Sequence, residues 1–185
     1  MTNWKEIWEK KGNSTLIDLR TLDGFENTSL DEKAAAAAII RQMNIQRDNK
    51  ILEVGCGAGM ISQFLDCDYT GIDYSSSLLA KHRALVKKNV YYGEANSLPF
   101  DDKAFDKSFA FSVFQYFPNH AYAEQVISEM KRVTKSCVFI GDLPITSHSP
   151  DHLVFRPETF LNWIVSPGFY NLRRFNVFIS LAGNY

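Results

Sequence analysis

Short apolar runs alternate with segments of helical periodicity along most of this chain. Runs with the length and composition of buried strands occur at residues 51–54, 69–73, 89–92 and 136–141. Helices are expected at residues 30–43, 58–65, 75–88 and 119–135. This alternation predicts an α/β fold, with a mostly parallel sheet flanked by helices and joined by right-handed crossovers.

Several element boundaries have local signals. Ser29 is expected to cap the helix at residues 30–43, with Glu32 completing a capping box. The apolar positions of residues 119–135 follow the i, i+3, i+4 spacing of an amphipathic helix. Pro157 is expected in the first turn of a later helix, and residues 170–181 are expected to form a last strand.

A glycine-rich turn follows the first expected strand. Gly55, Gly57 and Gly59 have the spacing Gly-x-Gly-x-Gly, and Asp73 ends the next apolar run. In a parallel sheet such a turn lets the backbone approach a nucleoside cofactor, and an acid about 20 residues later binds the ribose. Glu53 stands just before the turn, where its charge repels phosphate. We therefore expect a site for a cationic nucleoside rather than for a dinucleotide.

Residues 53–59 resemble the first motif of class I S-adenosylmethionine-dependent methyltransferases, Glu-x-Gly-x-Gly-x-Gly. The resemblance implies a Rossmann-like, doubly wound sheet that binds S-adenosylmethionine and releases S-adenosylhomocysteine. It also implies that Asp73 is the acid of the second motif, which accepts hydrogen bonds from both ribose hydroxyls. Such bonds to a charged acceptor are worth roughly 1.5–3 kcal/mol each, so Asp73 is expected to dominate cofactor affinity.

Two later segments extend the resemblance. Residues 92–101 are similar to the family's Gly-Asp-Ala-x-x-Leu-Pro-Phe segment, whose acid and next backbone amide meet the adenine; Glu94 and Ala95 stand at these positions. Glu94 is one methylene longer than the usual Asp. Residues 104–117 resemble the fourth strand and the loop after it, at the mouth where cofactor and acceptor meet. The implied cofactor-binding residues are Glu53, Gly55, Cys56, Gly57, Gly59, Asp73, Tyr74, Glu94, Ala95, Phe111 and Ser112.

The acceptor side of the site is less defined. Many relatives have a histidine where this chain has Tyr116. A general base is needed only if the acceptor arrives protonated, and the candidates are Tyr116, His120, Asp142, His148 and His152. No third ligand stands near the two histidines of the loop after residue 143, so no metal site is expected. Cys56 is expected to fill space, because transfer from a sulfonium needs no covalent enzyme intermediate.

Composition and charge limit the partners. With 185 residues, 45% hydrophobic residues and a net charge of −1, the chain can bury a core and has no electrostatic reason to bind nucleic acid or an acidic membrane. No run reaches the roughly 18 apolar residues of a membrane span, and the N-terminus lacks signal-peptide features, so a cytoplasmic protein is expected. The three cysteines are expected to be reduced thiols. A small-molecule methyl acceptor and a monomer or homodimer complete the expectation.

The two ends of the chain depart from this pattern. Trp4 and Trp8 lie on one helical face of residues 4–12. They pack on the sheet domain, belong to a lid over the cofactor and acceptor, or do both, since a lid packs when closed. We divide the chain into an N-terminal cap at residues 1–29 and a cofactor-binding domain at residues 30–185. The family closes its sheet with an antiparallel hairpin, but only one strand is expected here, so the hairpin is expected to be truncated or the edge covered by another chain.

The expected reaction is in-line transfer of the methyl group to an oxygen or nitrogen of a small molecule, where alignment supplies most of the acceleration. Two alternatives stay open: a non-catalytic cofactor-binding subunit that needs a partner, and an aminopropyltransferase-like enzyme of the same fold. An NAD-linked oxidoreductase is disfavoured, because the third glycine is misplaced for a pyrophosphate.

Overall fold

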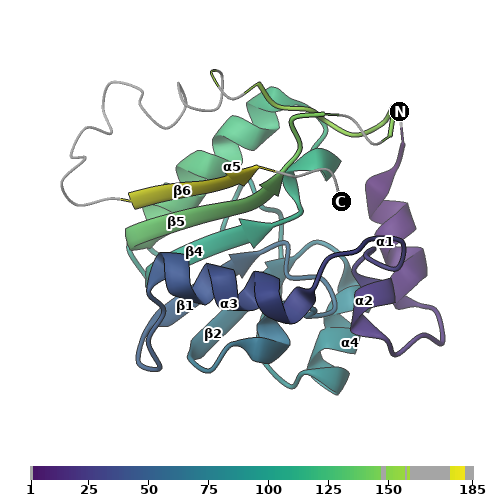
Figure 1. The fold of residues 1–185 in the computed structure, drawn as a ribbon, viewed down its shortest axis with the longest axis horizontal. Coiled ribbons are helices and arrows are strands. Elements are labelled where there is room, and N and C mark those ends of the chain that lie inside the picture. The colour runs from purple at the N-terminus through teal and green to yellow at the C-terminus, as the bar shows by residue number, and fades with distance from the viewer. Residues whose placement is uncertain (1, 147–148, 157, 159–175, 182–185) are drawn as a thin grey trace.

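A single parallel sheet organises the molecule in the computed structural model, which describes residues 2–146, 149–156, 158 and 176–181 (Figure 1). Its six strands have the order β3-β2-β1-β4-β5-β6, and every neighbouring pair is parallel. The order reverses between β1 and β4, which is where ligands bind in open α/β sheets. The strands are β1 (Lys50–Val54), β2 (Asp68–Asp73), β3 (Asn89–Tyr92), β4 (Phe105–Phe111), β5 (Thr134–Leu143) and β6 (Asn176–Leu181).

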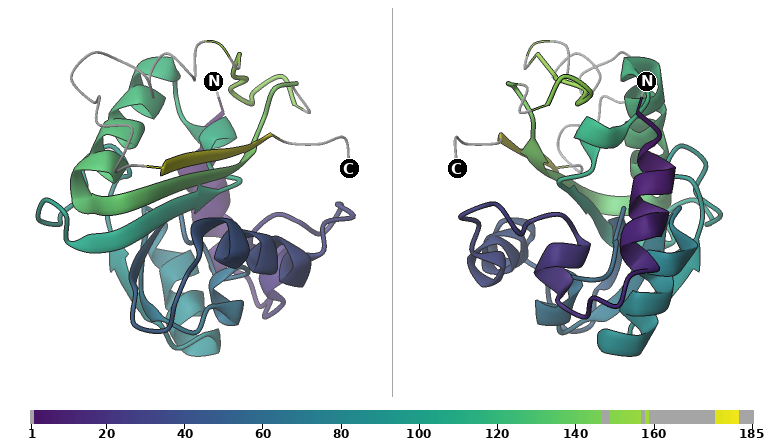
Figure 2. Two further views of the ribbon diagram at one scale, coloured as in Figure 1. Left: turned by 60° about the vertical axis from the view of Figure 1, so that its left-hand side comes forward. Right: turned by 90° about the vertical axis from the view of Figure 1, so that its right-hand side faces the viewer.

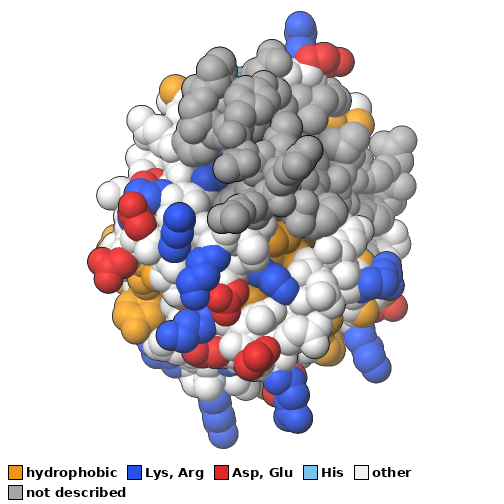
Figure 3. All heavy atoms as spheres, turned by 90° about the vertical axis from the view of Figure 1, so that its left-hand side faces the viewer, with side chains coloured by type: hydrophobic (Ala, Val, Ile, Leu, Met, Phe, Trp, Pro, Cys, Tyr) orange, Lys and Arg blue, Asp and Glu red, His pale blue; other side chains and the backbone are white. Residues whose placement is uncertain are grey.

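Helices cover both faces of this sheet, as a doubly wound fold requires. The α-helices are α1 (Trp4–Gly12), α2 (Leu19–Leu22), α3 (Glu32–Met43), α4 (Ser76–Leu85) and α5 (His120–Val133). Figure 2 shows α3 and α5 on opposite faces of the sheet, and α1 beside α4. At the end of the molecule where the strands begin, Lys and Arg side chains are interspersed with Asp and Glu in the described part (Figure 3). No helix of the described residues is long and apolar enough to cross a membrane.

The core has two layers because side chains alternate between the faces of a strand. In β1, Leu52 and Val54 pack in the cluster beneath α5, whereas Ile51 packs in the cluster that holds α3. All three side chains are fully buried. The two clusters fix the carboxyl end of β1 at the switch point of the sheet.

Two helix predictions were wrong in their details. Residues 58–65 form no α-helix; a 3₁₀ turn, η1 (Ser62–Phe64), is the only helical element there. Gly57 and Gly59 have φ values of 49° and 102°, which turn the chain away from helical geometry. Helix α3 is capped by Asp31, which accepts from the Ala34 amide at 2.9 Å, so Ser29 forms no capping box.

The C-terminal predictions are only partly described. Residues 176–181 of the expected last strand form β6, which pairs in parallel with β5. Pro157 and residues 170–175 lie outside the described residues, as do residues after 181. The expected truncated hairpin therefore stays a prediction.

Candidate functional site

The glycine-rich turn leaves the carboxyl end of β1 and bends sharply over the sheet. Gly55 has a φ of 74°, and a Cβ atom built on it would lie 2.5 Å from the Val113 side chain. A Cβ atom on Gly57 would lie 2.3 Å from a carboxylate oxygen of Asp23. Both positions therefore require glycine for conformation and for space.

Asp73 ends β2 next to this turn. One carboxylate oxygen accepts from the Gly57 amide at 2.9 Å and the other from the Ser75 amide at 2.8 Å. Burial, partly offset by these bonds, raises the pKa of Asp73 to about 6. The carboxylate is thus fixed in position, with lone pairs left for further donors.

Glu53 lies in β1, two residues before Gly55, and is buried. Its carboxylate accepts a hydrogen bond from the Tyr69 hydroxyl at 2.6 Å. Burial above all, together with the neighbouring acids Asp23 and Asp73, raises the pKa of Glu53 to about 8. Burial also raises the pKa of the Cys56 thiol well above its usual value, so this cysteine is a poor nucleophile.

Asp23 is the residue that sequence reasoning missed. It ends α2, and its carboxylate accepts from three consecutive backbone amides of the turn, those of Ala58 (2.6 Å), Gly59 (3.1 Å) and Met60 (2.8 Å). Burial raises the pKa of Asp23 to about 7. No local sequence signal could have found this contact, because residues 58–65 were expected to form a helix and Asp23 lies 35 residues before Ala58.

A cavity of about 330 Å³ opens at the carboxyl ends of these strands, within the size range of small-molecule sites. It brings together all of the expected cofactor residues except Gly59, which packs against Val86, His82 and Ser62 instead. Asp23 also lines it. The expected residues that line it are Glu53, Gly55, Cys56, Gly57, Asp73, Tyr74, Glu94, Ala95, Phe111 and Ser112.

Glu94 lies at one end of this cavity and is half exposed, with 49% of its side-chain surface accessible. Its carboxylate pairs with Lys5 of α1 at 3.4 Å and accepts from the Tyr122 hydroxyl at 3.1 Å. Lys5 Nζ also lies 5.6 Å from the ring centre of Tyr74. The expected adenine end is therefore in contact with the N-terminal helix.

Aromatic rings line the other part of the cavity. The Tyr116 ring lies 4.9 Å from that of Trp4 and 5.1 Å from that of Trp8, both on α1. Trp8 also packs against the small cluster of Leu22, Ala58 and Leu78. Trp8 therefore both packs against buried residues and lines the cavity. A lid motion of α1 stays a prediction.

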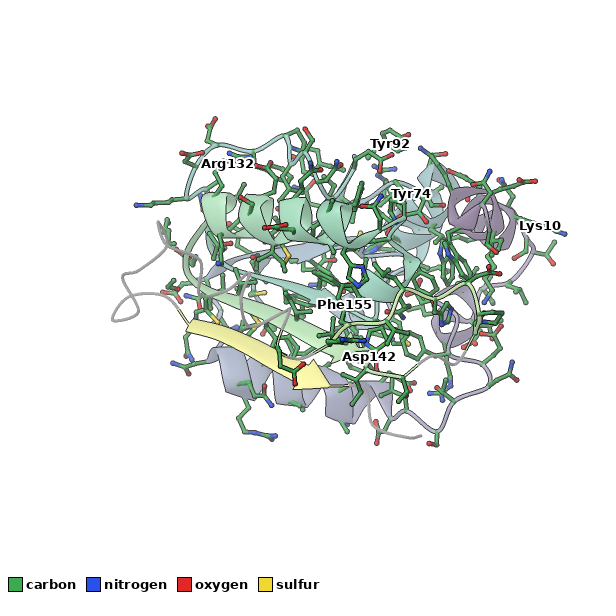
Figure 4. The ribbon with its side chains drawn as sticks, turned by 90° about the horizontal axis from the view of Figure 1, so that it is seen from above. Lys10, Tyr74, Tyr92, Arg132, Asp142 and Phe155 are labelled. Carbon is green, nitrogen blue, oxygen red and sulfur yellow. The ribbon has the colours of Figure 1, made fainter. Side chains whose placement is uncertain are left out.

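Of the described acceptor-side candidates, Tyr116 lines the cavity and three others do not. His152 lies against the Tyr116 ring at 5.3 Å. His120 is exposed, with its ring nitrogen 3.0 Å from the Val154 carbonyl oxygen. Asp142 lies apart from Tyr74 and Tyr92, which are on the α5 side of the sheet (Figure 4). His148 lies outside the described residues, and the described part contains no group of three or more His, Cys, Asp or Glu side chains that could hold a metal ion.

The fold is Rossmann-like and doubly wound, with a cavity at the switch point of its sheet. Residues 52–139 match the family described as "Methyltransferase domain", and they include most of β1, all of β2 to β4 and the glycine-rich turn. Over these residues the chain is similar to methyltransferase domains, and its fold is that of solved S-adenosylmethionine-dependent methyltransferases.

Named relatives match about half of the chain in sequence. Demethylmenaquinone methyltransferase of Geobacillus stearothermophilus is 30% identical over 109 residues, covering 52% of this chain and 45% of that protein. Sterol 24-C-methyltransferase of Saccharomyces cerevisiae is 29% identical over 102 residues, covering 49% and 26%. A SAM-dependent methyltransferase structure from Archaeoglobus fulgidus superposes with a TM-score of 0.59 at 16% identity, covering 72% and 67%. The chain spans less than half of the length of these curated relatives.

Proposed function

We propose that this protein transfers the methyl group of S-adenosylmethionine to an oxygen or nitrogen atom of a small-molecule acceptor. The observation that carries the proposal is the single cavity in which the expected cofactor residues adjoin a ring-lined region at α1. A donor and an acceptor that share one cavity can be held in line, and alignment is the main demand of this reaction.

Each side chain of the cavity has a role that follows from its position. The bound cofactor supplies an electrophilic methyl group on a positively charged sulfur. Asp73 holds the ribose and Glu94 receives the adenine. A cationic ligand is favoured because it stabilises the ionised form of the buried acid Glu53. Tyr116, on the acceptor side, orients the acceptor and excludes water together with the rings of α1. Burial raises the pKa of Tyr116, which favours the neutral hydroxyl as a hydrogen-bond donor.

A carbon acceptor with an apolar body is the second candidate. The acceptor part of the cavity includes the rings of Trp4, Trp8, Tyr116 and Phe117, which suit an apolar molecule better than a highly charged one. The name of the yeast relative specifies methylation at a carbon atom.

Calorimetry tests the cofactor half of the proposal. S-adenosylmethionine and S-adenosylhomocysteine should bind, whereas NAD and ATP should bind far more weakly, because the acids around the turn repel phosphate. Tighter binding of NAD would refute the assignment.

Turnover tests the acceptor half. Formation of S-adenosylhomocysteine should be screened against phenols, amines and isoprenoid quinols, and NMR of a ¹³C-methyl product should identify the methylated atom. A protein that binds the cofactor but turns over no acceptor, alone or with a partner, would favour the non-catalytic alternative.

A further inference from the structure

Asp23 presents a carboxylate to the cofactor cavity from outside the family-matched residues 52–139. Its oxygens accept three backbone N–H bonds, one on Oδ1 from Ala58 and two on Oδ2 from Gly59 and Met60. An ionised carboxylate has about four acceptor sites, so at least one site on Asp23 stays available to a ligand.

The amides of the turn are already used by this contact. Ala58, Gly59 and Met60 donate to Asp23, and Gly57 donates to Asp73. An anionic group of a ligand would have to displace a carboxylate from these amides. A cationic group would instead meet two oxygens that the amides hold in position.

Within the described residues Asp23, Glu53 and Asp73 form no salt bridge, although all three line one cavity. Lys88 lowers the pKa of Glu53 by its charge. Lys5, the cation on the cavity wall, is paired with Glu94. Burial raises the pKa of each of the three acids, so a bound cation would stabilise their ionised forms.

We infer that Asp23 binds the ammonium group of the amino-acid tail of the cofactor, so that the N-terminal segment selects the tail by its positive charge. This inference rests on the proposed function for the identity of the cofactor. It makes Asp23 a specificity-determining residue, and it assigns the turn amides to Asp23 rather than to the carboxylate of the tail.

Three thioethers of adenosine differ in which charged groups of the amino-acid tail they contain, so they test the ammonium and the carboxylate one at a time. S-adenosylhomocysteine has both ammonium and carboxylate, the aminopropyl thioether has the ammonium alone, and 5′-methylthioadenosine has neither. Calorimetry on the wild-type protein should give similar affinities for the first two and about tenfold or weaker binding for the third, since a charged hydrogen bond corresponds to roughly 10- to 100-fold in affinity.

The variant Asp23→Asn keeps the shape of the side chain and one acceptor oxygen. It should lose about tenfold or more affinity for the two ammonium-bearing ligands, and bind 5′-methylthioadenosine within about threefold of wild type. Asp18→Asn is the matched control: Asp18 caps the other end of α2, does not line the cavity, and should change none of the three affinities.

Other outcomes would overturn the inference. An equal loss for all three ligands in Asp23→Asn would mean that Asp23 only shapes the turn. If that variant does not fold, the wild-type series decides: an aminopropyl thioether that binds no more tightly than 5′-methylthioadenosine refutes the ammonium contact. Wild-type protein that binds none of the three refutes the proposed function itself.

Discussion

Replacing Asp73 with alanine should weaken the binding of S-adenosylhomocysteine by about two powers of ten. The carboxylate is anchored at both oxygens, by the Gly57 amide at 2.9 Å and the Ser75 amide at 2.8 Å, so its position is set before the ligand arrives. The remaining lone pairs suit two ribose hydroxyls. Each bond to the charged acceptor is worth roughly 1.5–3 kcal/mol, and water replaces part of it in the variant. A net loss of about 3 kcal/mol corresponds to about 100-fold in Kd.

Isothermal calorimetry on a graded series checks this reasoning. Asp73→Asn retains one acceptor oxygen and should lose about tenfold, between wild type and Asp73→Ala. Asp68→Asn is the control, because Asp68 begins the same strand β2, is exposed and does not line the cavity. If Asp73→Ala has a wild-type circular dichroism spectrum and binds S-adenosylhomocysteine within threefold of wild type, the ribose assignment is wrong.

Glu94→Gln should reduce affinity for S-adenosylhomocysteine by less than about tenfold in calorimetry, because Glu94 is half exposed and already paired; a larger loss would contradict this. Between pH 6.5 and 8, the free energy of unfolding of the cofactor-free protein should fall by about 2 kcal/mol in urea titrations. Burial raises the pKa of Asp23 to about 7 and of Glu53 to about 8, so the folded state keeps protons that the unfolded state has released, and a rise with pH would refute this sign. Trp8→Ala should lower the melting temperature because Trp8 packs on a buried cluster, whereas Trp4→Ala, which removes a ring from the cavity wall, should mainly reduce turnover; equal melting losses would contradict the distinction.

The strands and the turn could be predicted because their signals are local. An apolar run at residues 51–54 became β1 (Lys50–Val54), and the spacing of Gly55 and Gly57 reflects backbone angles that few other residues adopt. The same reasoning led to the cavity, whose lining includes the acid at the end of β2 and the segment after β3. The roles of these residues in binding stay predictions until ligands are measured.

The contact between Asp23 and the turn could not be predicted, because it joins positions far apart in the sequence. Helical periodicity at residues 58–65 indicated a helix, and the structure instead satisfies the amides of Ala58 to Met60 through a distant carboxylate. Nothing in the local sequence distinguishes a helix at these residues from a turn whose amides donate to a distant carboxylate. The acceptor side could not be predicted from the sequence either. His120 and Asp142 were candidates because they follow expected strands, and neither lines the cavity.

The N-terminal segment makes contacts across the predicted boundary at residue 30. Glu9 of α1 accepts from the Ser76 and Ser77 amides at the start of α4, at 2.7 and 3.2 Å, in the same way that Asp23 accepts from the turn. Each acid accepts hydrogen bonds from backbone amides that follow the carboxyl end of a strand, β1 for Asp23 and β2 for Glu9. Residues of the segment 2–29 therefore help to form the cavity proposed to bind the cofactor, and the cap predicted from the sequence is part of its wall.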